Sequence, residues 1–441
     1  MPFVVTQPVS QGSSGGSPVS FSVIANGTPT LAYQWRLNGT NISGATRTSL
    51  TIASPSSANS GGYAVRISNN YGAVTSAIAT LAVVPLAMVG DNSMGQFAVS
   101  AGAANAVAIS AGDWHTLALA RDGTLAVWGN NTYGQSDLPT AAASRSAQFG
   151  AMAAGGYHNL AVRTDGTVIG WGANFSGQAT PPPGLNHVIA VAAGEWHSLA
   201  LRSDGNVVGW GDNSAGQASP PPIPGNAIAI AAGGSHSLAL QDDGTVVAWG
   251  DNYNGSGTYA GQSAVPPGLA NVTAIAAGAY HSLALRANGT VVGWGDNSGG
   301  QISIPAGLTN VVAIAAGAGH SLALKRNGTI AAWGNNAFGQ CNFSASLSNV
   351  IAVAGGSLHS VALLGALPSV PQPVLPVLRG DGQFSLLLQT AFDKHYTLES
   401  KDSLNAATWN SITTISGNGS VQFLIDPAAS PPQRLYRVRQ W

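Results

Sequence analysis

The 441-residue chain carries 16 Lys and Arg residues against 17 Asp and Glu residues, so its formal net charge is −1 and only 7% of its residues are charged. A typical soluble protein has about a quarter, and the basic surface that phosphate backbones require is missing, which disfavours nucleic acid as a partner. No run approaches the ~18 apolar residues of a membrane span, so we expect no membrane insertion. The single cysteine, Cys341, excludes disulfides within the chain and disfavours a zinc–thiolate site.

Residues 1–85 predict a separate β-sandwich. Alternating apolar and polar residues, divided by Gly, Asn, Ser and Pro turns, indicate strands at 19–24, 32–37, 49–53, 63–68 and 75–83. Tyr33-Gln34-Trp35 resembles the buried tryptophan strand of an immunoglobulin-like domain, and residues 59–63 resemble its tyrosine corner. That family would place its two cysteines where this chain has Val23 and Val65. The resemblance implies an immunoglobulin-like domain with Trp35 in its core.

One phrase repeats seven times between residues 111 and 364: Ala-Gly or Gly-Gly, two variable residues, then His and an aliphatic run. The histidines are His115, His158, His197, His236, His281, His320 and His359, with spacings of 43, 39, 39, 45, 39 and 39 residues. A period near 40 with two or more apolar runs per unit is typical of a propeller or a solenoid. Helix-period runs with caps are absent, which excludes a helical solenoid.

The second half of each unit predicts a hairpin and a closing strand. An Asp-Gly or Asn-Gly turn is followed by an apolar run that ends in Trp-Gly, and a Gly-Gln pair comes six or more residues later. The first such half, at 90–96, has no His half before it, and the last His half, at 351–363, has no Trp-Gly half after it. We therefore predict an all-β chain with a seven-bladed propeller at 86–365 whose two ends share one blade, which hides both sheet edges.

Residues 314–340 resemble the repeat of the regulator of chromosome condensation family. The resemblance covers 86–364 and implies the propeller fold; the superfamily includes nuclear exchange factors, plant photoreceptors and a bacterial propeller that inhibits β-lactamases. The 39-residue period and the Pro-rich links after Gly-Gln are most similar to the bacterial branch. Exchange factors and the inhibitor-like propellers bind partners with the loops at the histidine end, so the resemblance implies a partner-binding face there.

The seven histidines have three interpretations. In a closed ring they lie at equal radius and depth, so neighbours could share a metal ion or act as bases in a hydrolase. They could also contact a ligand or partner. The favoured interpretation is structural: each imidazole satisfies backbone groups at the start of its own strand, because such a role is needed once per blade, whereas catalysis needs one to three copies. We expect no bound metal and no cofactor.

The residues just before the histidines vary, which a purely structural position would not. Four blades have large aromatics with polar tips there, and two of these have an acid one residue earlier. Such side chains among small residues are typical of binding hot spots; the alternative is that they fill the grooves between blades. An insertion at 253–260 adds a tyrosine on the rim. The candidate partner-binding residues are Asp113, Trp114, Tyr157, Glu195, Trp196, Tyr280 and Tyr259.

A Pro-rich stretch at 366–376 predicts a linker, and alternation resumes at 377–441. Strands are expected at 384–389, 396–400, 411–416, 421–425 and 435–439, with Trp409 buried. The pattern resembles the small terminal β-sandwiches of exported bacterial proteins and assigns no ligand.

The prediction for function is a bacterial surface or secreted binding protein, inhibitor-like or adhesive, that holds a protein or glycan partner on one propeller face and acts as a monomer. The net-acidic propeller argues against guanine-nucleotide exchange and chromatin binding. No secretory signal begins the chain, and we expect Met1 to start a fragment of a longer protein. The alternatives are a metal-dependent hydrolase built on the histidines and a purely structural surface module.

Overall fold

The computed structural model describes residues 1–13, 18–53, 55, 59–83, 85–143, 148–365, 372–378, 384–390, 394–403, 408–417, 421–426 and 434–441. Within these ranges the chain is almost entirely strand and turn, apart from a 3-10 helix at Ala101–Asn105 and the four-residue helix α1 (Thr140–Ala143). No helix in the described ranges is long and apolar enough to cross a membrane.

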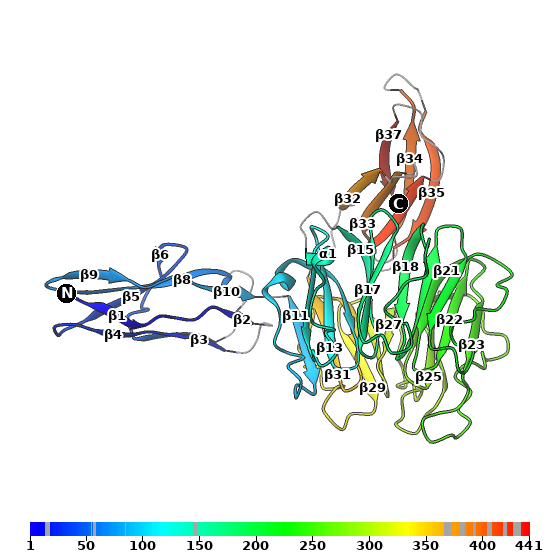
Figure 1. Ribbon diagram of the computed structural model, residues 1–441, viewed down its shortest axis with the longest axis horizontal. Helices are drawn as coiled ribbons and strands as arrows, with labels where there is room; N and C mark the ends of the chain where they lie inside the picture. Colours follow the sequence, from blue (N-terminus) through cyan, green and yellow to red (C-terminus); the bar gives the residue numbers. More distant parts are fainter. Residues whose placement is uncertain are drawn as a thin grey trace. The chain divides into compact units, whose positions relative to one another are not determined.

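The N-terminal domain is a β-sandwich (Figure 1). Its strands are β1 (Phe3–Thr6), β2 (Gln11–Ser13), β3 (Val19–Ser22), β4 (Ile24–Asn26), β5 (Ala32–Leu37), β6 (Thr40–Asn41), β7 (Ser49–Ile52), β8 (Gly61–Asn69), β9 (Gly72–Thr75) and β10 (Ala79–Val83). The main sheet has the order β2-β10-β8-β5-β6, with β9 also paired to β8, and smaller sheets pair β1 with β4 and β3 with β7.

The core of this domain has the expected immunoglobulin features. The Trp35 side chain is fully buried, as predicted. The Tyr63 hydroxyl donates to the Asn59 carbonyl at 2.7 Å, which is the predicted tyrosine corner. Val23 and Val65 are buried against the same cluster, so apolar packing replaces a disulfide at these two positions.

Seven three-stranded antiparallel sheets make up the described propeller, one per blade, and confirm the predicted fold. Six consist of consecutive strands: β12 (Ala106–Ala111), β13 (His115–Ala120), β14 (Leu125–Gly129); β15 (Phe149–Ala154), β16 (His158–Arg163), β17 (Val168–Gly172); β18 (Val188–Ala193), β19 (His197–Arg202), β20 (Val207–Gly211); β21 (Ala227–Ala232), β22 (His236–Gln241), β23 (Val246–Gly250); β24 (Val272–Ala277), β25 (His281–Arg286), β26 (Val291–Gly295); and β27 (Val311–Ala316), β28 (His320–Lys325), β29 (Ile330–Gly334). The seventh is composite: β30 (Val350–Gly355) and β31 (His359–Leu364) pair with β11 (Leu86–Gly90).

Strand register fixes two ends of the propeller. In the first consecutive blade His115 pairs with Gly129, and Leu119 pairs with Leu125 beside the β-turn. The loops before each histidine and after each third strand therefore lie at one end, which we call the histidine end. The turns between second and third strands lie at the other, which we call the hairpin end.

The recurring tryptophans pack between neighbouring blades. Trp210 packs in one cluster with Leu160 and Val188, and Leu160 belongs to the preceding blade. Its indole Nε1 donates to the Gln178 carbonyl at 2.8 Å, which anchors the ring to the segment between the two blades. Equivalent bonds, between 2.6 and 3.0 Å, are made by Trp128, Trp171, Trp249, Trp294 and Trp333.

A ring of glycines brings the inner strands into contact around the axis. A Cβ added to Gly233 would lie 2.4 Å from the carbonyl oxygen of Gly278 in the next blade and 2.3 Å from His236 Cε1. The same approach to the next blade recurs at Gly112, Gly155, Gly194, Gly278, Gly317 and Gly356, and the last of these meets Gly112 again. Only glycine fits here, because the backbone of the next blade occupies the space of a side chain.

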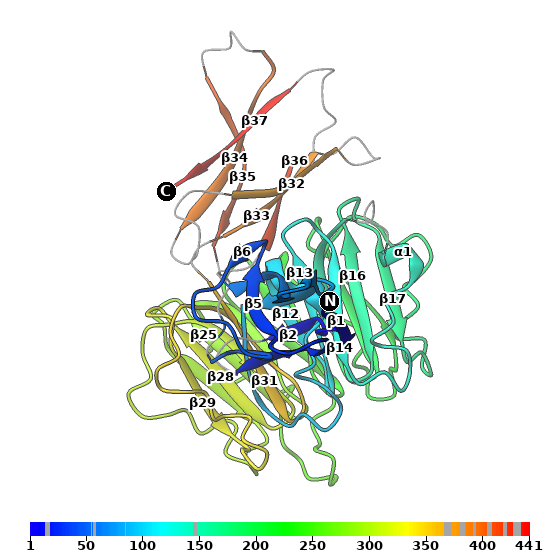
Figure 2. The same cartoon turned by 90° about the vertical axis from the view of Figure 1, so that its left-hand side faces the viewer.

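The C-terminal domain begins earlier than predicted. Its strands are β32 (Gln372–Leu378), β33 (Phe384–Gln389), β34 (His395–Lys401), β35 (Asn410–Ser416), β36 (Val421–Asp426) and β37 (Leu435–Gln440), in sheets of order β32-β33-β36 and β35-β34-β37 (Figure 2). Residues 372–376 of the expected linker thus belong to β32, while 366–371 lie outside the described residues. Trp409, expected to be buried, is half-buried beneath Lys401 and Arg437, so its ring serves as a cation–π surface.

Candidate functional site

The seven repeated histidines form a closed circle of contacts between neighbouring blades. Each imidazole is fully buried, and its Nε2 lies within hydrogen-bonding distance of the small polar residue that follows the histidine of the next blade. The pairs are His115–Asn159 (2.8 Å), His158–Ser198 (2.9 Å), His197–Ser237 (2.9 Å), His236–Ser282 (2.9 Å), His281–Ser321 (3.0 Å), His320–Ser360 (2.7 Å) and His359–Thr116 (3.2 Å).

The hydrogen bonds also assign the protonation state. Ser198 Oγ donates its own proton to the Gln178 carbonyl at 2.8 Å, so it accepts the proton on His158 Nε2. The opposite nitrogen, Nδ1, is buried without a partner in the described structure. Burial lowers the pKa of His158 to about 3, so the imidazole is neutral at physiological pH.

Two interpretations of these histidines need correction. Their side chains bond to the next blade, not to backbone groups of their own strand as we expected. They are also not arranged as a shared metal site, because each Nε2 is used between blades; among the described residues no group of three or more His, Cys, Asp or Glu side chains could hold a metal ion. The hydrolase alternative therefore loses its proposed ligands, which act as structural links between blades.

Three of the predicted aromatics meet at the histidine end. Trp114, Tyr157 and Trp196 occupy the same position in three successive blades. All three are half-buried, so part of each side chain packs against the protein and part is accessible to solvent. The Tyr157 and Trp196 rings lie 5.7 Å apart between centroids, and a side-chain hydrogen bond links Tyr157 to Trp114. The three blades therefore present one continuous aromatic surface.

Two further aromatics extend this surface and were missed by the sequence reasoning. Tyr133 makes edge-to-face contacts with Tyr157 at 5.4 Å and with Phe175 at 5.3 Å, and Phe175 lies 6.3 Å from Trp196. Their side chains are 44% and 71% exposed, so they are the most accessible members. The signal was present in the sequence, because these are variable positions in the loops between Trp-Gly and Gly-Gln. We call Trp114, Tyr133, Tyr157, Phe175 and Trp196 the aromatic arc.

The other two predicted tyrosines lie at the insertion in a different blade. Tyr259 and Tyr253 are exposed, form an isolated β-bridge, and contact each other edge-to-face at 5.7 Å. Tyr280 is half-buried against the same loop, where an added Cβ on Gly255 would lie 2.7 Å from its hydroxyl. The structure thus divides the predicted site residues between the aromatic arc and this tyrosine group.

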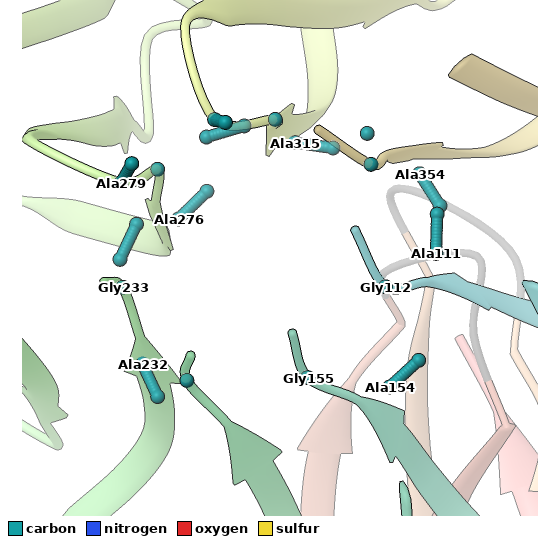
Figure 3. A pocket seen from close by; sticks show the side chains of 18 of the residues that line it. Ala111, Gly112, Ala154, Gly155, Ala232, Gly233, Ala276, Ala279, Ala315 and Ala354 are labelled. Atoms are coloured by element: carbon teal, nitrogen blue, oxygen red, sulfur yellow. The ribbon is translucent and has the colours of Figure 1, made fainter. Parts of the chain in front are cut away.

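The two predicted acids line a cavity on the propeller axis. The cavity has a volume of about 510 Å³, and its lining includes Asp113, Glu195 and Tyr280. Alanines and glycines of the inner strands form most of its wall, and Figure 3 shows their short side chains around an open centre. Burial, together with the nearby charge of Glu195, raises the pKa of Asp113 to about 7.

Charge is unevenly distributed between the two ends of the propeller. The loops of the histidine end carry no described Lys or Arg, while their carboxylates are Asp91, Asp113, Asp137, Glu195, Asp212, Asp251 and Asp296. At the hairpin end, the described basic residues are Arg121, Arg163, Arg202, Arg286, Lys325 and Arg326. The aromatic arc therefore lies on a strongly acidic face.

Comparison with known proteins agrees with this architecture. The regulator of chromosome condensation (RCC1) repeat matches six segments, at 106–135, 151–178, 188–217, 227–256, 272–301 and 311–340, and the immunoglobulin I-set domain matches 2–83. No curated protein sequence matches the chain.

Two similar solved structures are of the same yeast protein. Prp20p from Saccharomyces cerevisiae, described with its binding properties to Gsp1p and histones, has a TM-score of 0.51 at 19% identity, covering 64% of this chain and 91% of that one. Yeast RCC1 (Prp20) bound to Kap60 has a TM-score of 0.52 at 19% identity, covering 64% and 89%. At this identity the likeness concerns the fold. The chain therefore contains RCC1 repeats, which form its propeller, and an immunoglobulin I-set domain at its N-terminal side.

Proposed function

We propose that this protein binds a protein partner at the histidine end of its propeller. The observation that carries the proposal is the aromatic arc, in which ring contacts join four aromatic side chains of consecutive blades and a side-chain hydrogen bond joins Trp114 to them. Aromatic side chains with polar tips are enriched in binding hot spots, because they bury large area at little cost in conformational entropy. The reported binding of Prp20p to Gsp1p and histones supports a protein-binding use of this fold.

The charge of the face indicates what kind of partner fits. Seven carboxylates lie in the loops of the same end of the propeller, and these loops contain no described basic residue. Such a field favours encounter with basic protein surfaces and disfavours acidic ones. We therefore propose a partner surface that is basic around an apolar contact.

An exported or cell-surface bacterial setting belongs to the same proposal, with the two flanking β-sandwiches as spacers or adhesive modules of a monomeric chain. The low content of charged residues supports it. A glycan is the alternative occupant of the arc, since sugar rings also stack on aromatic side chains, and the experiment below distinguishes it.

Photo-crosslinking tests the arc directly. A benzoylphenylalanine placed at Phe175, which is 71% exposed, should capture the partner from extracts or culture medium. The matched control is Phe338, which is 52% exposed in the corresponding loop of a distant blade. Mass spectrometry of the product identifies a protein or a glycan.

Affinity then decides the assignment. With the captured partner in purified form, Phe175→Ala combined with Trp196→Ala should weaken binding by more than about tenfold, as hot-spot truncations do. Phe338→Ala should leave the affinity unchanged. Equal affinity of the arc variant and the parent would show that the proposed face is wrong.

A further inference from the structure

Seven equivalent positions, two residues before each histidine, surround the axis at the histidine end. We call them the mouth ring: Asp113, Gly156, Glu195, Gly234, Ala279, Ala318 and Ser357. All seven line the axial cavity. Five of these positions have glycine, alanine or serine, so the two acids are the only side chains of the ring that extend beyond a single group on Cβ. Gly156 stands between their blades, and its Cα lies against Glu195, where an added Cβ would be 3.1 Å from Glu195 Cγ.

The two acids of the mouth ring differ from the other carboxylates of this end. Asp212 and Asp296 each accept a hydrogen bond of 2.6 Å from the side-chain amide of a buried glutamine. These two carboxylates therefore already have a partner and stabilise the conformation of their own loops. Asp113 and Glu195 make no side-chain hydrogen bond and no ion pair with any described residue. Asp113 is half-buried, and its raised pKa reflects desolvation and the nearby charge of Glu195 without a compensating partner.

The cavity below the ring matches one kind of side chain. Its described wall consists mostly of alanine and glycine from the inner strands, together with isoleucine, valine, two serines and Tyr280, and the charged groups in this lining are Asp113 and Glu195. An aliphatic stem would contact the alanine methyl groups, while a cationic head would meet the carboxylates; Lys and Arg side chains have this division into apolar stem and charged tip. A metal ion fits less well, because the described residues offer no third acidic, histidine or cysteine ligand here.

We propose that the axial cavity receives one lysine or arginine side chain of the protein partner, held by Asp113 and Glu195. This inference rests on the proposed function and adds a specific anchor to it: the aromatic arc supplies apolar contact, and the mouth ring selects a cation at the centre of the face. Two neighbouring, unpaired and half-buried carboxylates are unfavourable in the free protein, and the incoming cation reduces that penalty.

Blocked amino acids provide the probe. N-acetyl-lysine methylamide and its arginine counterpart should shift the side-chain carboxyl ¹³C signals of Asp113 and Glu195 in a saturable way. The ε-acetylated lysine probe keeps the stem without the charge and should cause no such shift. Asp113→Asn or Glu195→Gln should weaken binding of the charged probe by about tenfold or more, while Asp137→Asn, at an exposed position of the same end, should leave it unchanged.

The outcomes separate this inference from the proposed function. Equal binding of charged and neutral probes, equal binding by the Asp113→Asn/Glu195→Gln double variant, or no shift at the solubility limit of the charged probe would each overturn the cavity assignment. If a partner captured at Phe175 binds the double variant as tightly as the parent, the anchor is wrong and the binding face stands. If the charged probe binds while arc variants keep full partner affinity, the face is wrong and the cation pocket stands.

Discussion

His320 Nε2 donates to Ser360 Oγ in the next blade at 2.7 Å, and Ser360 in turn donates to the Gln340 carbonyl at 2.8 Å. The histidine therefore joins one blade to a side chain of its neighbour and, through that side chain, to the segment between the two blades. Because the final contact returns from His359 to Thr116, these links close on themselves. Each bond is buried, so its loss leaves an unsatisfied polar group in the interior.

Removing one imidazole should destabilise the propeller. His197→Ala leaves a cavity and takes the hydrogen bond from Ser237, so we expect a loss of about 3 kcal/mol in unfolding free energy. Urea unfolding followed by tryptophan fluorescence measures it. The control is His187→Asn, at a turn where φ is 55° and equivalent turns have Asn271 and Asn310 at 56° and 57°; it should change stability by less than about 0.5 kcal/mol. Similar losses in both variants would contradict this link between blades.

Stability should fall steeply in mild acid. Burial lowers the pKa to about 4 for His115, His197 and His320 and to about 3 for the other four ring histidines, against about 6.5 in an unfolded chain. Between these values the unfolded state binds more protons, so stability is complete above about pH 6.5 and is lost as the pH falls toward about 4.

The pH slope can be measured from urea unfolding between about pH 7.5 and pH 5. Each buried histidine should contribute up to about 1.4 kcal/mol per pH unit in that window. His320→Gln should have a shallower slope than the parent, because one titrating group is gone. A flat profile would show that the imidazoles are not held neutral.

Replacing the Asp113 carboxylate should stabilise the free protein. The pKa of Asp113 is raised to about 7, first by burial and then by Glu195, against about 3.9 when unfolded, so its ionisation costs stability as the pH rises from about 4 to 7. At about pH 8, Asp113→Asn should therefore raise the unfolding free energy by about 1–3 kcal/mol, and near pH 4 by almost nothing. Asp137→Asn should have little effect at either pH. A destabilised Asp113→Asn protein at pH 8 would contradict this.

The glycine ring should tolerate no side chain. Gly233→Ala would place a Cβ 2.4 Å from the Gly278 carbonyl oxygen, so we expect a loss above about 3 kcal/mol or failure to fold. Gly319→Ala is the matched control, because its nearest neighbour would be Asn335 Cβ at an ordinary 3.5 Å. Thermal unfolding of the two variants compares them; a stable Gly233→Ala protein would show that neighbouring blades are not in contact at this depth.

The sequence predicts the propeller well because each blade repeats the same contacts. The equivalents of Trp210 and Gln178 recur 32 residues apart in five blades and 36 apart in a sixth, so the period alone reveals the blades. The partner of His197 could not be found in this way, since Ser237 is 40 residues away and a serine inside a strand carries no distinctive signal. The role of the small polar residue that follows every repeated histidine becomes clear only from the hydrogen bonds in the structure.

Prediction of the candidate site was limited because its residues, unlike those that hold the blades together, do not repeat. Trp114 and Trp196 stood out because they interrupt a constant motif. Tyr133 and Phe175 lie in loops whose lengths and residues vary, so their contact with those rings required the structure. The pairing of Asp113 with Glu195 around the axis likewise depends on ring closure, which brings blades 82 residues apart in sequence to one cavity.

The composite blade has a mechanical consequence. Gly90 packs against His359 at the histidine end, so the chain enters β11 at Leu86 and leaves β31 at Leu364 at the hairpin end. Tension applied between the two flanking sequences therefore acts on one blade, at the same end of two paired strands. It breaks the hydrogen bonds between the two strands one after another, starting at the hairpin end. Under such tension the ring would open at this seam first.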